Sequence, residues 1–388
     1  MPRLLALLIL LLTPLHARPQ AHDTIPLPLR AANGAIHIAE TLLNALTITR
    51  PKLSLALYPA ASYSSRSGLA IGIMPMLQLH PARLPQPITI TPSALVSTKH
   101  MFEVQCDADI FFNNNLDLTL KFESQHQPDD LYTIGNQTHK LPIAQYNYSR
   151  QLLTADLLKG LPHHPTLRLG LSIDFDHYSF SHISPTPSDS LTALTLTALT
   201  LTTSSAGHNL GIGLTLGIDS RDNTLWPTRG SYSRLRLLAY SRLSHATPYA
   251  ALSLDARRYL PIRSSTLALQ AFADLRLGHD IPFPKLATCA GTRLGRAIGH
   301  NLKYLDRTAW LAQAEFRAPL FWRIGGTLFT AIGNVTHTPA ALLSHVHLMC
   351  GAGLRLAVFP GKGLNLRLDA GLSQRGDKAI YFNIREAF

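Results

Sequence analysis

The sequence predicts an all-β fold, namely a sixteen-stranded antiparallel transmembrane β-barrel. Three observations predict it: an export leader, a low charge content, and an alternation of apolar and polar residues that continues to the last residue. Only 15% of the 388 residues are charged and 46% are hydrophobic, whereas soluble globular proteins carry about 25% charged residues. A barrel that is apolar on its outer face accounts for this composition.

The N-terminal residues have the order of an export leader. A short basic start precedes an apolar run at residues 4–12 and the segment Thr-Pro-Leu-His-Ala17. This order predicts a secretory signal peptide over residues 1–17, with cleavage after Ala17 or Ala21. A helix needs about 20 apolar residues to span a membrane, and no run in the chain reaches that length. We therefore expect an exported protein without a transmembrane helix.

A lead segment and a barrel domain are expected to follow the leader. Residues 18–51 are interpreted as a periplasmic N-terminal lead segment. Within it, residues 36–49 show the clearest helix-like spacing of apolar side chains, which predicts a short helix. The barrel domain is expected over residues 52–388.

Strict alternation marks the segments expected as strands. Examples are residues 167–175, 312–317 and 364–371, in which apolar side chains alternate with polar, charged or glycine residues. Alternate side chains of a strand face opposite sides of a sheet, so one face is apolar and the other carries the charges. Soluble strands average about 5–6 residues, and tilted membrane-spanning strands need about 9–11. The length of these segments favours spanning strands, and we count about sixteen, an even number as in bacterial barrels.

The last strand has a signal of its own. Ile380, Phe382 and Ile384 alternate toward the terminal Phe388. A closing strand that ends on an aromatic residue resembles the recognition signal of outer-membrane barrels. The last strand of a soluble β-domain would show the same alternation, so the leader and the low charge content favour the barrel.

Several classes of function find no support. The net charge of +12 does not indicate nucleic-acid binding, because Lys and Arg form no run or stripe. Three cysteines are too few and too scattered for a disulfide scaffold or a zinc site, and His345 and His347, on one side of an expected strand, lack a third ligand. No nucleophile elbow, P-loop or His-Glu-x-x-His motif occurs. We therefore expect neither an enzyme nor a bound cofactor.

A turn at residues 219–230 carries a family resemblance. The residues of its motif are Asp219, Arg221, Asp222, Asn223, Pro227 and Gly230. With this turn the chain resembles the bacterial surface antigen family, the barrel domain of the BamA/TamA outer-membrane superfamily. Segments at 304–322, 331–335, 351–355, 366–369 and 384–388 follow in family order, and residues 132–138 resemble a motif of members whose whole mature chain is the barrel.

The resemblance implies a long loop between strands 11 and 12, here about residues 278–307, that folds into the lumen. The family places an Arg-Gly-aromatic motif in this loop, whereas this chain reads Gly295-Arg296-Ala297-Ile298-Gly299. The arginine is present and the two residues after it differ.

Candidate partners for Arg296 follow from alternation. Glu315 and Asp369 lie on the polar, lumen-facing side of their strands, and a guanidinium fork suits a carboxylate. We predict a latch of Arg296, Glu315 and Asp369; the alternative is a solvated Arg296 in a surface loop. Other lumen-facing charges either hold water in a polar lumen or join the latch: Asp174, Asp176, Arg317 and Arg367.

The resemblance also implies a role in inserting or translocating proteins or lipids at the outer membrane, through partial opening of the seam between the first and last strands. About 35 residues separate Ala17 from the first strand, too few for a POTRA domain, so client polypeptides would need a separate periplasmic partner. Outer-membrane lipids and lipopolysaccharide are the expected surroundings. Two alternatives stay open: a loop-gated porin-like channel, and a structural surface barrel.

Overall fold

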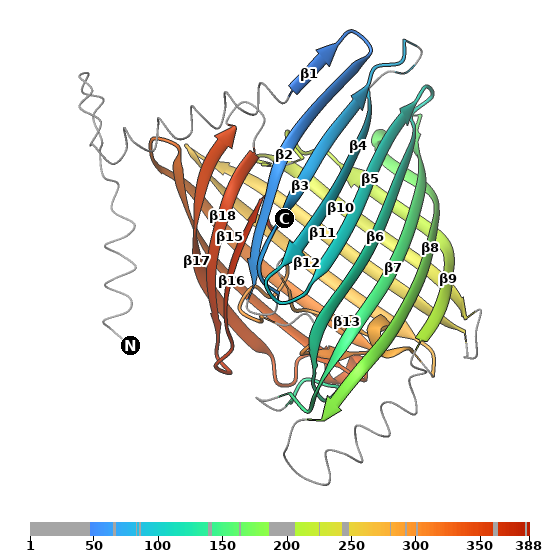
Figure 1. The fold of residues 1–388 in the computed structure, drawn as a ribbon, viewed down its shortest axis with the longest axis vertical. Coiled ribbons are helices and arrows are strands. Elements are labelled where there is room, and N and C mark those ends of the chain that lie inside the picture. Colours follow the sequence, from blue (N-terminus) through green and yellow to red (C-terminus); the bar gives the residue numbers. More distant parts are fainter. Residues whose placement is uncertain are drawn as a thin grey trace. The chain divides into compact units, whose positions relative to one another are not determined.

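The structure, a computed structural model, is a closed barrel. It describes residues 47–388 except 65–66, 83, 85–86, 139–141, 163, 186–205, 225, 243–247, 280, 292, 300–301, 360–363 and 385. Sixteen strands are each antiparallel to the next along the chain, and the last pairs with the first (Figure 1). The predicted all-β, sixteen-stranded antiparallel barrel is confirmed.

The wall is formed in chain order by β2 (Leu53–Ser64), β3 (Gly68–Leu79), β4 (Ile88–Ser97), β5 (Phe102–Phe112), β6 (Leu116–Leu131), β7 (Ala144–Leu161), β8 (His164–Pro185), β9 (Ala206–Asp219), β10 (Gly230–Arg242), β11 (Tyr249–Ile262), β12 (Ser265–Leu277), β15 (Thr308–Phe321), β16 (Ile324–Thr336), β17 (His347–Phe359), β18 (Leu364–Ser373) and β19 (Lys378–Ile384). Apart from β19, with 7 residues, these strands have 10 to 22 residues. That length suits a tilted crossing of the hydrocarbon layer.

Shorter elements accompany the wall. β1 (Thr47–Arg50) pairs with the start of β2. β13 (Ala287–Thr288) and β14 (Leu305–Asp306) form a small sheet within the long loop. Two 3-10 turns, η1 (Phe283–Lys285) and η2 (Pro339–Ala341), complete the list of described elements. No described helix is long and apolar enough to cross a membrane.

The prediction of a helix at residues 36–49 is wrong at its C-terminal end. Thr47–Thr49 lie in β1, where Thr and Ile are β-branched residues that suit a strand and where an edge of β2 is available for pairing. The rest of that segment, like the predicted signal peptide over residues 1–17, lies outside the described residues.

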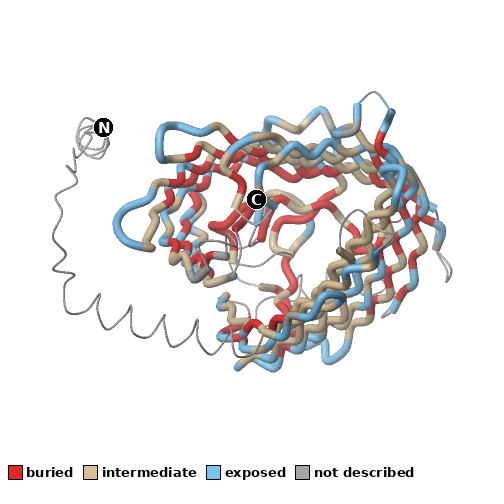
Figure 2. Tube along the Cα trace, turned by 90° about the horizontal axis from the view of Figure 1, so that it is seen from above, coloured by how far each residue is buried: buried red, intermediate tan, exposed pale blue. Residues whose placement is uncertain are grey.

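The two faces of the wall differ as the alternation predicts. Leu171 and Ile173 of β8 are 58% and 45% exposed on the outside, whereas Ser172 and Asp174 between and beside them are buried inside. Figure 2 shows buried residues along the inner side of the ring and on segments within it. The apolar outer face suits lipid, and part of the charged inner face is covered by other parts of the chain.

Candidate functional site

The loop between β12 and β15, residues 278–307, folds back into the barrel. Its side chains Cys289 and Ile298 are fully buried and share one cluster with Leu311 and Met349, which are lumen-facing residues of β15 and β17. Buried segments lie within the ring of strands in Figure 2. Apolar residues in this loop therefore replace water along one side of the lumen.

Arg296 of this loop reaches both of its predicted partners. Its Nη1 lies 2.6 Å from Oε2 of Glu315 and 2.8 Å from Oδ2 of Asp369. All three side chains are fully buried, and the guanidinium carbon lies 3.8 Å from the centre of the Phe329 ring. The structure thus brings together the three residues of the predicted latch, on β15, β18 and the loop.

A tight return of the backbone places Arg296 there. The N–H of Gly295 donates to the carbonyl oxygen of Cys289 at 2.9 Å. A Cβ on Gly295 would lie 2.6 Å from that same oxygen, so only glycine permits the approach.

Three further arginines extend the cluster. Arg317 Nε lies 2.6 Å from Glu315 Oε1, and Arg355 Nη1 lies 2.6 Å from Asp369 Oδ1. Arg355 Nε also lies 2.8 Å from Glu386 Oε2, and Arg367 Nε lies 3.6 Å from Asp369 Oδ2. Each of these carboxylates is thereby paired with at least one guanidinium, because a buried charge without a partner would be costly.

Arg317 joins this cluster to the other two predicted motifs. Its Nη1 donates to the carbonyl oxygen of Pro227 at 3.3 Å, and its Nη2 donates to the carbonyl oxygen of Phe388 at 2.7 Å. The guanidinium also lies over the rings of Trp226 and Phe388, at 5.1 and 5.7 Å. The loop, the turn at 219–230 and the C-terminal residues therefore meet at the buried side chain of Arg317, for which the sequence predicted a lumen-facing position without a specific partner.

The turn itself is held by its acidic and amide side chains. Asp219 pairs with Arg221 at 2.7 Å, and Asn223 Oδ1 accepts from the N–H of Trp226 at 3.0 Å. Asp222 Oδ1 accepts from the N–H of Thr228 at 2.9 Å. Burial opposes ionisation of Asp222, but hydrogen bonds from Thr228 and Arg229 outweigh it and lower the pKa of this carboxyl.

The alternation predicted for the closing strand holds within β19, which ends at Ile384, and not beyond it. Ile380 is 51% exposed on the outer face, and Phe382 and Ile384 pair with Leu368 and Leu366 of β18. β19 then ends, and Phe388 lies buried inside with Tyr259, Ala268 and Ala387. The expectation that alternation runs on to Phe388 is wrong. The last residues turn into the lumen, where Arg355 pairs with Glu386 and Arg317 donates to the carbonyl oxygen of Phe388.

Lys285 forms a second anchor of the loop that the sequence analysis missed. Its Nζ lies 2.5 Å from Asp176 Oδ2 and 3.3 Å from Asp174 Oδ1, both on β8. Arg150 of β7 pairs with the same Asp176 at 3.0 Å. The signal in the sequence was the Asp-x-Asp spacing on the inward face of a strand. Two buried carboxylates so close together need a cation from another segment of the chain.

A third set of contacts joins the loop to neighbouring turns. The N–H of Gly135 donates to Leu305 O at 2.8 Å, and Lys303 Nζ lies 2.5 Å from Asp377 Oδ1. Burial opposes ionisation of Asp377, but hydrogen bonds from Lys303, Ser373 and Tyr304 lower its pKa.

The two histidines do not share a strand face. β17 begins at His347, so His345 lies in the preceding turn. His347 Nε2 is hydrogen-bonded to Asn136 Oδ1. Among the described residues, no group of three or more His, Cys, Asp or Glu side chains could hold a metal ion.

Among the described residues, the seam between β2 and β19 has the fewest register pairs in the wall. Phe382–Tyr63 is the pair found there, whereas twelve pairs join β2 to β3. A cavity of about 590 Å³ lies beside it, lined by Ser62 of β2 and Asn383 of β19 among others. Charged side chains of both signs line this chamber: Glu103, Asp107, Glu123, Glu386, Lys121, Arg236, Arg293 and Arg367.

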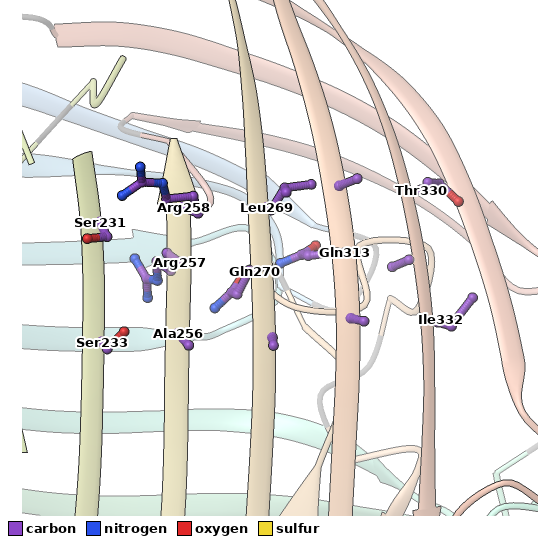
Figure 3. Close-up of a pocket in the computed structure, with 14 residues that line it drawn as sticks. Ser231, Ser233, Ala256, Arg257, Arg258, Leu269, Gln270, Gln313, Thr330 and Ile332 are labelled. Carbon is purple, nitrogen blue, oxygen red and sulfur yellow. Dashed lines mark hydrogen bonds between the residues drawn. The ribbon is translucent and has the colours of Figure 1, made fainter. Parts of the chain in front are cut away.

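A second hollow, of about 660 Å³, lies across β10, β11, β12, β15 and β16 (Figure 3). Its outward-facing residues are mostly short, such as Ser233, Ala256 and Ala271. Arg258 stands on the same outward face and is exposed. Short side chains on a lipid-facing wall leave room for acyl chains rather than for a polar ligand.

Comparison with known proteins decides the family. A model of the Omp85 superfamily domain matches residues 102–388. The chain belongs to the Omp85 superfamily. The predicted resemblance to the BamA/TamA superfamily is thereby confirmed, and with it an outer-membrane β-barrel of this family. No curated protein sequence matches the chain.

Solved structures of this superfamily share the fold. BamA from Haemophilus ducreyi lacking POTRA domains 1–3 is 11% identical with a TM-score of 0.59, covering 94% of this chain and 80% of that chain. CdiB from Acinetobacter baumannii is 12% identical and CdiB from Escherichia coli 10%, each with a TM-score of 0.54 and covering 87% of this chain. The match spans 60% and 63% of the two CdiB chains.

Proposed function

We propose that this Omp85 barrel inserts or translocates polypeptides at the outer membrane by opening its wall between β2 and β19. The observation that carries the proposal is that the described residues of this seam form one register pair, whereas those of β18 and β19 form seven. An unpaired strand edge offers its N–H and C=O groups to another strand. The seam is therefore where the wall separates at the lowest cost in hydrogen bonds.

The interior supports this proposal over a porin-like channel. The long loop is held at Arg296 to β15 and β18 and at Lys285 to β8, so it crosses the lumen that a pore would need. The polar chamber of about 590 Å³ is left on the side of the seam. A client segment has room there, next to the strands that would part.

Delivery of the client belongs to the same proposal. The described residues, from 47 onward, form the barrel and the short β1, with no periplasmic domain among them. A separate periplasmic protein that binds unfolded clients would supply this step.

A reversible disulfide across the seam tests the proposal. Tyr63→Cys and Phe382→Cys, in a background with Cys106, Cys289 and Cys350 changed to Ala, would join two residues that are register partners across the seam. We expect the oxidised protein in lipid vesicles to lose insertion of an unfolded outer-membrane barrel, and reductant to restore it.

A second disulfide provides the matched control. Ala61→Cys with Ile71→Cys joins β2 to β3, a pair that does not part in this mechanism, and should leave insertion unchanged. Equal insertion by the oxidised and reduced seam variants would refute opening at β2–β19.

Depletion of the protein in cells, followed by an outer-membrane proteome, should show loss of client barrels.

A further inference from the structure

The outer face of β6 to β9 changes from apolar to polar along one line across these four strands, which are neighbours in the wall (Figure 1). On one side of the line the outward residues are mostly apolar, and the last of them are register partners: Phe122, Leu153, Phe175 and Leu210. On the other side, two rows of register partners are polar apart from Ala206. We call their seven polar members the polar ledge: Ser124, Gln151, His177 and His208 in the first row, and His126, Ser149 and Ser179 in the second.

The polar ledge lies at the extracellular end of the barrel. β6 leads from its apolar residues through the ledge into the connection at 132–143, and β12 runs in the same direction into the long loop at 278–307. The other end of the barrel has short turns, such as 113–115 and 263–264. Outer-membrane barrels have short periplasmic turns and longer extracellular loops. The ledge therefore faces the outer leaflet and the space directly above it.

The height of the ledge exceeds the depth of a phospholipid headgroup. Outward residues follow one another at about 6.8 Å along a strand, so two polar rows reach about 14 Å beyond the last apolar row. At a strand tilt of about 40°, this is about 10 Å along the membrane normal. The interfacial layer of a bilayer is about 5–8 Å thick on each side of the hydrocarbon core. A headgroup that contacts both rows therefore extends above this layer.

The side chains of the ledge suit sugar hydroxyls and phosphates. His126, Gln151 and His208 are exposed. The half-buried ring of His177 stacks on the ring of His208, with centroids 4.2 Å apart and an interplanar angle of 22°. His126 Nδ1 is hydrogen-bonded to Ser149 Oγ at 2.7 Å. Imidazole, hydroxyl and amide groups both donate and accept hydrogen bonds, and none of the seven side chains is a carboxylate that would repel an anion.

The interior of the barrel supports the ledge from behind. Tyr148 and Tyr178 alternate with ledge residues on β7 and β8, and they pack in the lumen with Phe283 of the long loop. Lys285 of the same loop pairs with Asp176, also on β8. A surface held in place by such packing binds a ligand without a large cost of ordering.

We propose that the polar ledge binds the phosphorylated sugar headgroup of lipopolysaccharide, whose acyl chains lie against the apolar residues of the same four strands. The ledge continues the lipid-facing wall without a break, so one glycolipid molecule contacts both. A phospholipid headgroup would contact the first polar row alone. This site is distinct from the seam between β2 and β19, and it does not depend on opening of the wall there.

Binding of fluorescently labelled lipopolysaccharide with core sugars tests the proposal, with the purified barrel in detergent micelles. His177→Ala combined with His208→Ala should weaken binding about tenfold, because the loss of two ordinary hydrogen bonds corresponds to a factor of this size. His177→Gln combined with His208→Gln keeps donors and acceptors at both positions, and should recover most of the affinity. Labelled phosphatidylglycerol should bind all these forms equally.

The matched control removes two exposed histidines from the periplasmic end. His80→Ala combined with His164→Ala should bind lipopolysaccharide like the parent, and heat-modifiable gel mobility shows that each variant is folded. Equal binding of lipopolysaccharide by the parent and the ledge alanine variant overturns the proposal. An equal loss for phosphatidylglycerol also overturns it, since the ledge would then be a general site for anionic lipids.

Photo-crosslinking in cells separates a glycolipid from a protein partner. Gln151 is exposed and is the register partner of His177, so Gln151→p-benzoylphenylalanine places the crosslinker on the ledge. We expect a product that contains lipopolysaccharide, identified by a carbohydrate stain, and no such product from His80→p-benzoylphenylalanine. A product with protein alone from position 151 would overturn the proposal and assign the ledge to a protein partner.

Discussion

Arg296 holds the loop through its charge, which Nη1 brings to both carboxylates, and through the packing of its guanidinium on the Phe329 ring. Arg296→Ala leaves Glu315 and Asp369 buried with one cation fewer, and breaking a buried pair from one side costs about 3–5 kcal/mol. We expect a loss of that order in the free energy of unfolding of the barrel, measured in urea, together with faster proteolysis of the loop. Arg296→Lys keeps the charge but loses the planar group that packs on Phe329, and its loss of stability should be intermediate.

Double-mutant cycles with Glu315→Gln and Asp369→Asn isolate these contacts. Coupling energies near zero for both, with a loop that protease already cuts in the parent, would contradict the latch. Arg263→Ala, at an exposed turn residue, is the control for loss of an arginine elsewhere.

Lys285 should behave as an independent anchor. It binds Asp174 and Asp176 of β8, whereas Arg296 binds β15 and β18. Lys285→Ala should therefore expose the first half of the loop to protease and leave the Arg296 contacts intact, and its effect should add to that of Arg296→Ala. Strong non-additivity would show that the two ends of the loop dock as one unit.

The difference between these two anchors shows what a sequence can say about a site. Glu315 and Asp369 could be predicted because alternation fixes which face a strand residue occupies, and a guanidinium seeks carboxylates. Lys285 could not, since its place depends on how a loop of 30 residues, 278–307, crosses the lumen. The contact of Arg317 with Phe388 joins residues 71 positions apart and is set by the tertiary fold alone.

At the scale of elements, the turn between β9 and β10 depends on one glycine. Gly230 has φ +99°, and a Cβ there would lie 2.1 Å from the carbonyl oxygen of Ser220. Gly230→Val should lower the temperature at which the barrel loses its folded gel mobility, because neither the backbone conformation nor the space accepts a side chain. Gly217→Ala is the matched control, since its Cβ would have 3.9 Å of clearance; equal loss for both variants would mean that backbone strain at Gly230 is not the cause.

The segment after β19 is a second element with a measurable role. Phe388 is 4% exposed and packs with Tyr259 and Ala268, and removing a buried Phe side chain costs about 3–5 kcal/mol. Phe388→Ala should destabilise the folded barrel and reduce the amount assembled, while export continues. Normal stability combined with poor assembly would assign Phe388 to recognition during assembly rather than to packing.

The alternation of apolar and polar residues determines which elements could be predicted. It marks strands and their faces, so the sixteen wall strands could be found. It carries no information about residues beyond a strand end, and the inward path of residues 386–388 was therefore missed. The helix-like spacing at 36–49 gave a wrong prediction for Thr47–Thr49. These residues pair with β2, and tertiary pairing overrides local propensity.

At the scale of the whole molecule, the lumen is divided. Arg296 and the arginine cluster lie on the side of β15 to β18, the loop reaches from there to β8, and the chamber of about 590 Å³ remains beside β2 to β7 and the seam. This division places rigid, ion-paired structure on β15 to β18, next to β19 and to the part of the wall with the fewest register pairs among the described residues. If the wall separates, we therefore expect the strands to part first at the seam between β2 and β19.

The same division predicts how the barrel conducts. With the loop anchored on both sides, by Arg296 and Lys285, the purified protein in a planar bilayer should show small and infrequent openings. Lys285→Ala combined with Arg296→Ala removes the two ion-paired anchors that hold the loop across the lumen and leaves the contacts of Leu305 and Lys303. The segment between the two anchors can then move aside, so larger and more frequent openings should appear at unchanged barrel fold, checked by heat-modifiable gel mobility. Arg263→Ala should conduct like the parent. A parent that already conducts as a steady wide pore, unchanged in the double variant, would show that the loop does not obstruct the lumen and would favour the channel function over client insertion.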